Sequence, residues 1–175
     1  MKKQFEQQRI AVLGLGDTGF SVLRWLRQMN AEVVMFDSRQ HPAGLDRLQE
    51  EFPEVEYHLG PFNAALLSAM DLIVASPGVS LKEPAIAEMI AQGKSVVGDV
   101  ELFARFRAPY AKVIAITGSN GKTTVTSLVG EICKQAGLNT IVAGNIGLPV
   151  LDTLQMTAPD VYVLELSSFQ LETTH

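Results

Sequence analysis

The sequence predicts an α/β protein built from parallel sheets in two successive units. Short apolar, β-branched runs alternate along the chain with stretches of helical periodicity, which is typical of parallel strands joined by helices. Glycine-rich loops follow two of these runs, at residues 14–19 and 118–121, and each loop opens a helix. Two such starts predict two sheets, a Rossmann-like domain followed by an incomplete P-loop α/β central domain.

The first unit is predicted to span residues 1–109, with about five strands. Its clearest strands are expected at residues 9–13, 32–36, 72–75 and 95–97. Helices are expected at residues 18–29, 83–92 and 100–106. Pro84 and Gly93 give the second of these helices a common start and stop signal. The linker is placed at residues 107–111, where Arg-Ala-Pro-Tyr-Ala precedes a new strand.

The second unit is predicted to span residues 110–175. Strands are expected at residues 112–116, 140–143 and 161–166, and a helix at residues 123–135. Three strands are fewer than most independently stable α/β sheets contain, so this domain is expected to be truncated. Residues 161–166 are expected to form an exposed apolar edge, with fraying or self-association there.

Composition and charge exclude several classes of partner. The net charge of -5 and the pI near 5.2 argue against a nucleic-acid surface, which needs clustered Lys and Arg. No apolar run near the start is long enough for a signal peptide or a membrane span, so no membrane insertion is expected. A single cysteine, Cys133, fits a reducing compartment, and a cytoplasmic location is expected.

Cys133 is predicted to be a core residue rather than a reactive thiol. It shares one apolar stripe of the predicted helix with Val125, Leu128, Val129 and Ile132. The histidines have no paired ligand spacing, so no zinc site is expected at His41, His58 or His175.

The first glycine loop has the context of a dinucleotide-binding loop. Gly14, Gly16 and Gly19 follow a strand and open a helix, whose N-terminus offers free N–H groups to an anion. Asp37 ends the next strand, 18 residues after Gly19, near the spacing at which an acid meets a ribose hydroxyl. Alone, this pattern indicates NAD. The alternatives are that the glycines only permit tight packing, and that Asp17 repels phosphate unless it turns away to cap the helix.

The second loop, residues 117–124, carries the strongest signal in the chain. Its backbone N–H groups can wrap phosphate oxygens, Lys122 can reach the β and γ phosphates, and the Thr123 hydroxyl can bind magnesium. The loop is shorter than the general GxxxxGK[ST] pattern, because its first glycine, Gly118, comes only three residues before Gly121. A chance Gly-Lys-Thr sequence is disfavoured, since strand, loop and helix are in register.

The motif at residues 117–124 resembles the compact ATP loop of the Mur ligase and folylpolyglutamate synthetase family. Further motifs, at residues 14–21, 37–39, 76–79, 144–147 and 165–171, together resemble the D-glutamate-adding branch of that family. The resemblance covers essentially the whole chain. It implies that the first domain holds the UDP end of the substrate instead of NAD.

The resemblance assigns roles residue by residue. The residues that it places around the UDP substrate are Asp17, Thr18, Asp37, Arg39, Gly78 and Asn145. The residues that it places around ATP are Gly118, Ser119, Asn120, Gly121, Lys122, Thr123 and Thr124. Lys122 and Glu165 become catalytic, and Thr123 and Glu165 become magnesium ligands. For Arg39 a solvated loop arginine is an equally ordinary interpretation, and Glu165 could instead cap the turn at Ser167.

The implied reaction is the ATP- and Mg²⁺-dependent ligation of D-glutamate to UDP-N-acetylmuramoyl-L-alanine through an acyl phosphate, in peptidoglycan precursor synthesis. The resemblance puts the D-glutamate site in a later domain, so the chain alone is expected to be inactive. Two alternatives stay open: a UDP-sugar-binding module without catalysis, and an NAD-binding Rossmann domain.

Overall fold

A computed structural model describes residues 4–174 and confirms the α/β class with parallel sheets. The chain forms two compact units, Met1–Asp99 and Val100–His175. This division falls after the first residue of helix α5 (Asp99–Phe106), whereas the expected linker lies after the whole helix. The rings of Phe103 and Tyr162 pack edge to face at 4.9 Å, which ties α5 to the second unit. The functional boundary between residues 109 and 110 therefore stays a prediction.

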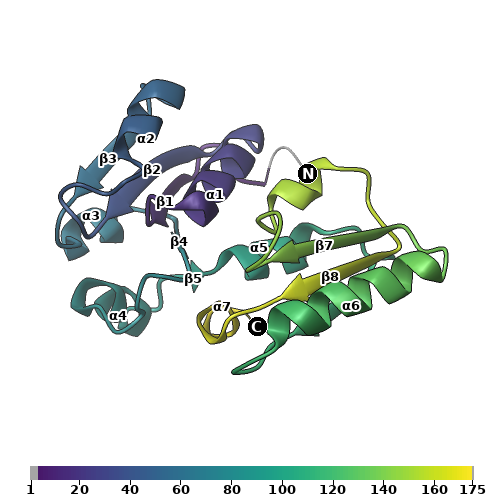
Figure 1. Ribbon diagram of the computed structural model, residues 1–175. Coiled ribbons are helices and arrows are strands. Elements are labelled where there is room, and N and C mark those ends of the chain that lie inside the picture. Colours follow the sequence, from purple (N-terminus) through teal and green to yellow (C-terminus); the bar gives the residue numbers. More distant parts are fainter. Residues whose placement is uncertain (1–3, 175) are drawn as a thin grey trace. The chain divides into compact units, whose positions relative to one another are not determined.

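The first unit is a five-stranded parallel sheet in the order β3-β2-β1-β4-β5. The strands are β1 (Arg9–Leu13), β2 (Glu32–Asp37), β3 (Glu56–Leu59), β4 (Leu72–Ala75) and β5 (Val96–Val97). The helices are α1 (Asp17–Gln28), α2 (Leu45–Glu51), α3 (Ala64–Ser68) and α4 (Pro84–Ala91) (Figure 1). Strands β1, β2 and β3 follow one another from the centre toward one edge of the sheet, and β4 and β5 then follow one another toward the other edge. Ligands of open α/β sheets bind at this switch point, beside the carboxyl ends of the strands.

Strands β1 and β4 form the centre of the first core. Their side chains are buried except at Arg9, as expected for parallel strands covered on both faces. Helix α1 contributes Phe20 and Trp25, and the Trp25 ring packs edge to face against Phe5 at 5.9 Å. This packing fixes the position of α1, and therefore of the glycine loop that precedes it.

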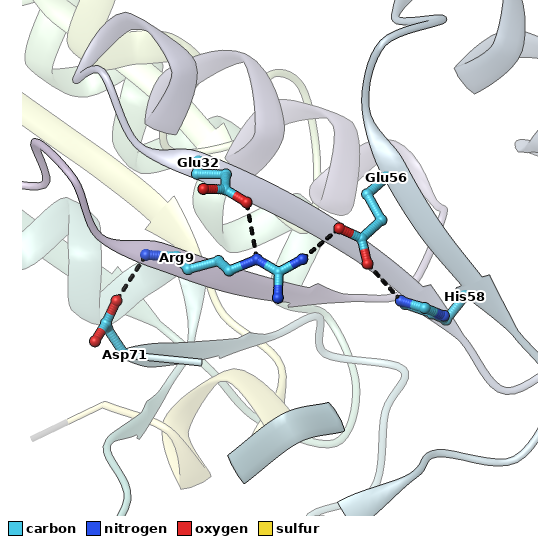
Figure 2. Close-up of polar contacts among 5 residues, drawn as sticks. All are labelled: Arg9, Glu32, Glu56, His58 and Asp71. Carbon is cyan, nitrogen blue, oxygen red and sulfur yellow. Dashed lines mark hydrogen bonds and ion pairs between the residues drawn. The ribbon is translucent and has the colours of Figure 1, made fainter. Parts of the chain in front are cut away.

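Polar side chains hold three strands together near their amino ends (Figure 2). Arg9 donates from Nε to Glu32 Oε1 at 2.8 Å and from Nη2 to Glu56. His58 Nε2 donates to the other Glu56 oxygen at 2.8 Å, and the Arg9 amide donates to Asp71 Oδ2 at 2.7 Å. The Arg9 guanidinium thus spans β1, β2 and β3, and fixes the edge strand β3.

This cluster predicts a pH dependence of stability. The hydrogen bond from His58, followed by the contacts from Arg9, outweighs desolvation and holds the pKa of Glu56 below its ordinary 4.5. A lowered carboxyl pKa stabilises the fold above the ordinary value, and that contribution disappears as pH falls through the folded-state pKa. We expect Glu56→Gln to flatten the acid limb of urea unfolding curves, with the exposed Glu50→Gln as control. Identical acid limbs for both variants would contradict the assignment.

The second unit is a three-stranded parallel sheet in the order β6-β8-β7. Its elements are β6 (Lys112–Ile116), α6 (Lys122–Gln135), β7 (Thr140–Gly144), the 3-10 helix η1 (Asp152–Gln155), β8 (Val161–Glu165) and α7 (Ser168–Glu172). Helix α6 runs alongside β7 and β8 (Figure 1). Within residues 4–174, no helix is both long enough and apolar enough to cross a membrane.

The expected apolar edge at residues 161–166 is wrong, because β8 pairs on both sides and is fully buried. The exposed apolar side chains lie instead on β6, at Val113 and Ile114. The predicted burial of the Cys133 stripe is also wrong for most of its members: Val125, Leu128 and Ile132 are exposed, and Cys133 is half-buried.

The Cys133 stripe is largely exposed because α6 packs against the sheet through small residues instead. Thr126 and Gly130 are the buried residues of the helix. A Cβ on Gly130 would press on Val142 of β7, so the contact requires glycine. The larger apolar residues of α6 therefore face away from β7 and β8.

We expect the chain to self-associate through this exposed apolar surface of β6 and α6. Leu128→Glu with Ile132→Glu should lower the association measured by sedimentation velocity, because charge on an apolar surface opposes burial. The exposed control Ser127→Glu should leave it unchanged. A monomeric unaltered chain at high concentration would contradict this expectation.

Candidate functional site

The glycine loop, residues 14–19, lies at the switch point of the first sheet. Gly14 has a φ of +103°, which favours glycine. A Cβ on Gly14 would come within 3.1 Å of Ser76 Cβ, and one on Gly19 would overlap the Gly14 carbonyl oxygen. The loops after β1 and β4 therefore meet closely at the carboxyl end of the sheet.

Asp37 braces this loop from the end of β2. Its side chain is buried, with both carboxylate oxygens bound. The Leu15 amide donates to Oδ2 at 2.9 Å, and Arg39 donates to the carboxylate from its amide at 3.0 Å, from Nε at 2.8 Å and from Nη2 at 2.7 Å. Four donors fill the roughly four acceptor positions of a carboxylate. Asp37 thus has no acceptor position left for a ribose hydroxyl.

Burial by itself would raise the pKa of Asp37, but the hydrogen bonds from Arg39 and the Leu15 amide outweigh it and hold the pKa below the ordinary 3.8. The ion pair therefore stabilises the first unit above that pH, and this stabilisation is lost as pH falls through the lowered pKa of Asp37.

We expect Asp37→Asn to cost about 2–3 kcal/mol of unfolding free energy at neutral pH, through the lost charge-assisted bonds. Urea unfolding followed by the fluorescence of Trp25, the single tryptophan, measures it. The exposed Asp46→Asn should cost less than about 1 kcal/mol.

The other residues assigned to the UDP substrate are more open. Asp17 begins α1 with its side chain 94% exposed, and the N-cap of this helix is Gly16 without a side-chain hydrogen bond, so Asp17 does not turn away to cap the helix. Thr18 is half-buried, Gly78 lies in open space after β4, and the Arg39 side chain is 59% exposed. All four follow strands β1, β2 or β4 at their carboxyl ends. Asn145 belongs to the second unit instead.

The phosphate loop, residues 117–124, joins β6 to α6. Gly118 has a φ of +149°, and Gly121, the N-cap of α6, has a φ of +76°. Lys122 begins the helix, and its Nζ donates to the Gly118 carbonyl oxygen at 2.8 Å, across the loop. The loop is therefore closed by its own lysine.

A cavity of about 380 Å³ opens beside this loop. Its lining residues come from three segments of the second unit: Thr117, Gly118, Ser119, Lys122, Asn145, Ser167, Ser168 and Phe169. Of the residues assigned to ATP, Gly118, Ser119 and Lys122 line it. Asn120, Gly121, Thr123 and Thr124 are exposed parts of the same loop and helix start.

Glu165 lies at the carboxyl end of β8, next to the cavity. Its side chain is buried, Oε1 accepts from Asn145 Nδ2 at 3.2 Å, and Oε2 has no hydrogen-bond partner among the described residues. The backbone fixes the same pair, because the Asn145 amide donates to the Glu165 carbonyl oxygen at 2.8 Å. Glu165 therefore presents one buried, unsatisfied carboxylate oxygen.

The alternative role of Glu165 as a cap is contradicted. The turn before α7 is capped by Ser167 and Gln170: the Gln170 amide donates to Ser167 Oγ at 3.2 Å, and the Ser167 amide donates to Gln170 Oε1 at 3.0 Å. This capping box orders the turn that carries Ser168 and Phe169 into the cavity wall.

The donor chemistry fits a magnesium ion. Mg²⁺ usually takes one or two carboxylates and completes its shell with water and phosphate oxygens. The unsatisfied Glu165 oxygen could serve as such a ligand, and the Thr123 hydroxyl lies on the first turn of α6. No group of three or more His, Cys, Asp or Glu side chains suited to a metal occurs in the described part of the chain, which excludes His175.

Some site residues were missed in the sequence. Thr117, Ser167, Ser168 and Phe169 line the cavity but received no role. The Ser167-x-x-Gln170 spacing is a capping-box signal that could have located the turn. The Leu15 amide, which donates to Asp37, could not be predicted from the residue type, because any residue supplies a backbone amide.

The two units together have the architecture of nucleotide-binding α/β proteins, each with a glycine-rich loop between a parallel strand and a helix. The MurD-like N-terminal domain of Mur ligases matches residues 8–98, and the Mur ligase middle domain matches residues 116–175. The chain therefore belongs to the Mur ligase family, with an N-terminal domain of the MurD-like type. The resemblance expected from the sequence is confirmed.

Curated relatives agree with this assignment. The chain is 61% identical over 172 residues to a UDP-N-acetylmuramoylalanine–D-glutamate ligase of Methylobacillus flagellatus, covering 98% of this chain and 38% of the relative. It is 53% identical over 190 residues to the enzyme of that name from Thiobacillus denitrificans, covering 98% and 40%. The chain thus spans about two fifths of the length of these relatives.

A solved structure shares the fold. The UDP-N-acetylmuramate:L-alanyl-gamma-D-glutamyl-meso-diaminopimelate ligase of Neisseria meningitides matches with a TM-score of 0.54 and 19% identity, over 90% of this chain and 52% of that chain.

Proposed function

We propose that the chain is the substrate-nucleotide and ATP-loop part of an ATP-dependent ligase that joins D-glutamate to UDP-N-acetylmuramoyl-L-alanine in the cytoplasm. The observation that carries this is the cavity of the second unit, where Lys122 and the Asn145–Glu165 pair lie around one phosphate loop. Membership of the Mur ligase family and the high identity to D-glutamate ligases support the choice of substrate.

The proposed reaction activates a carboxylate, which is a poor electrophile. The L-alanine carboxylate oxygen attacks the γ-phosphorus of ATP and ADP leaves, so that an acyl phosphate forms. The D-glutamate amine then attacks the acyl carbon, phosphate leaves, and the amine loses a proton. The products are the amide, ADP and phosphate. When bound, Mg²⁺ would neutralise charge on the phosphate oxygens.

The residues of the phosphate loop have distinct roles in this proposal. Lys122 would leave the Gly118 carbonyl and donate to the β and γ phosphates, since its ammonium is already held over the loop. The Gly118–Lys122 amides would bind phosphate oxygens, with Ser119, Asn120 and Thr124 beside them. Glu165 and Thr123 would hold the metal, and Asn145 would contact the muramoyl-peptide part.

In the first unit, Asp17, Thr18, Arg39 and Gly78 would surround UDP, and Asp37 would hold Arg39 in place. The saturated carboxylate of Asp37 disfavours an NAD-binding role, because it cannot accept from a ribose without losing Arg39 or the Leu15 amide. The outer edge of the Arg39 guanidinium suits a phosphate or a base carbonyl.

Calorimetric titration of the chain with UDP-N-acetylmuramoyl-L-alanine, NADH and ATP-Mg in parallel tests the proposal. Binding of the UDP compound and of ATP-Mg without NADH is expected, together with no ADP release when both substrates are added to this chain alone. Binding of NADH alone would contradict the assignment. Binding of the UDP compound without ATP would support a UDP-sugar-binding module.

A further inference from the structure

A carboxylate stands at the anion-binding end of helix α1. Asp17 is the first residue of α1 and its side chain is almost fully exposed. The N-terminus of a helix favours anions, but a fixed negative charge at the same end opposes a second anion. A phosphate-bearing ligand therefore needs this charge to be compensated.

Arg47 of α2 is placed to compensate it. Its Nη1 lies 3.5 Å from Asp17 Oδ1. The guanidinium carbon lies 4.3 Å from the centre of the Phe20 ring, and Nε donates to Glu51 Oε1 at 2.8 Å. Phe20 is buried in the core, so the arginine lies on a rigid support.

The start of α2 is also fixed against the glycine loop. A Cβ on Gly44, the N-cap of α2, would overlap the Leu15 carbonyl oxygen and come within 2.9 Å of the Phe20 ring. Only glycine permits this approach, so the backbone holds Arg47 close to the loop. The arginine side chain is 40% exposed, and its charge reaches the loop surface.

We propose that Arg47 is a positioning residue of the glycine-loop site, which neutralises Asp17 and holds its carboxylate aside so that the end of α1 accepts the diphosphate of a UDP ligand. The assignment rests on the proposed function of the first unit. Arg47 acts through Asp17, and its removal harms binding only while Asp17 is charged.

Titration of the chain with UDP, for a set of variants, tests the pair. Arg47→Met keeps an apolar stem over Phe20 and removes the charge, and it should weaken UDP binding about tenfold. In the Asp17→Asn background, where no charge is left to neutralise, Arg47→Met should have no further effect, so the double variant should bind UDP as tightly as Asp17→Asn alone. The effect of Arg47→Met should shrink as salt is raised, because the pair is exposed.

Arg27 offers a matched control. It lies over the Phe52 ring at 5.7 Å and pairs with Glu54, but it stands in the last turn of α1, at the opposite end from the loop. Arg27→Met should leave UDP affinity unchanged. Arg47→Lys, which keeps the charge, should bind within about threefold of the unaltered chain.

Two results would overturn the role of Arg47: an Arg47→Met change that weakens UDP binding as much in the Asp17→Asn background as in the unaltered chain, or an Arg47→Met chain with unchanged affinity. Absence of UDP binding by the unaltered chain would instead contradict the proposed function, and the role of Arg47 with it. Trp25 fluorescence during urea unfolding checks that every variant retains the first unit.

Discussion

Replacement of Gly19 by alanine is expected to destabilise the first unit by more than about 3 kcal/mol, although alanine is the better helix former by about 1 kcal/mol. The new Cβ would overlap the Gly14 carbonyl oxygen, which is backbone and cannot rotate away. Relief requires α1 to move from β1, and that movement would open the packing around Phe20 and Trp25. Urea unfolding followed by Trp25 fluorescence measures the loss.

Gly16 supplies the control within the same loop. A Cβ on Gly16 would meet nothing within 4 Å, and its φ of -106° suits any residue. Alanine at this N-cap should cost no more than about 1 kcal/mol. Equal losses for the two variants would mean that the loop tolerates a shift of α1, and that Gly19 is not required for the close approach.

The parts of the fold that the sequence predicted are those with local signals. The β-branched runs, the glycine loops and the capped helices recur in the structure with small shifts at their ends. Strand β3 and helices α2 and α3 gave no signal that could be used. β3 is a four-residue, partly exposed edge strand without a β-branched residue, and the two helices have seven and five residues.

The orientation of α6 shows what periodicity alone does not determine. The helix has an apolar stripe and a face of small residues, and both faces could pack on a sheet. The small face packs against β7 and β8 because Gly130 allows close approach to Val142, a constraint set by a partner strand twelve residues away. The rule that the most apolar face of a helix is buried fails here, because the close approach of the helix backbone to the strand determines which face packs on the sheet.

The candidate site likewise has parts that the local sequence predicts and parts that it does not. The phosphate loop could be predicted because its residues are contiguous in the sequence. The brace between Asp37 and the Leu15 amide joins positions 22 residues apart, and the pair of Asp17 and Arg47 joins positions 30 apart, with one partner on a helix that was not predicted. Such contacts depend on the strand order, which the local sequence does not contain.

Because the proposed function gives Glu165 a metal-binding role, replacement of Glu165 by glutamine is expected to weaken Mg²⁺-dependent ATP binding about 100-fold. The same change should leave the second unit equally stable or about 1 kcal/mol more stable. Glutamine can still accept from Asn145 through its carbonyl oxygen, and it removes a buried charge whose second oxygen has no partner. A residue kept for metal binding is expected to combine lost binding with retained stability.

Glu131→Gln is the matched control, because Glu131 lies in the same unit, is exposed and accepts from Gln135 Nε2 at 2.8 Å. It should change neither ATP binding nor stability by a measurable amount. Calorimetric titration with ATP at several Mg²⁺ concentrations gives the binding term, and thermal unfolding gives the stability. A Glu165→Gln chain that loses more than about 2 kcal/mol and keeps its Mg²⁺-dependent ATP affinity would identify Glu165 as a structural acid, since a buried group whose loss is costly is engaged in the fold.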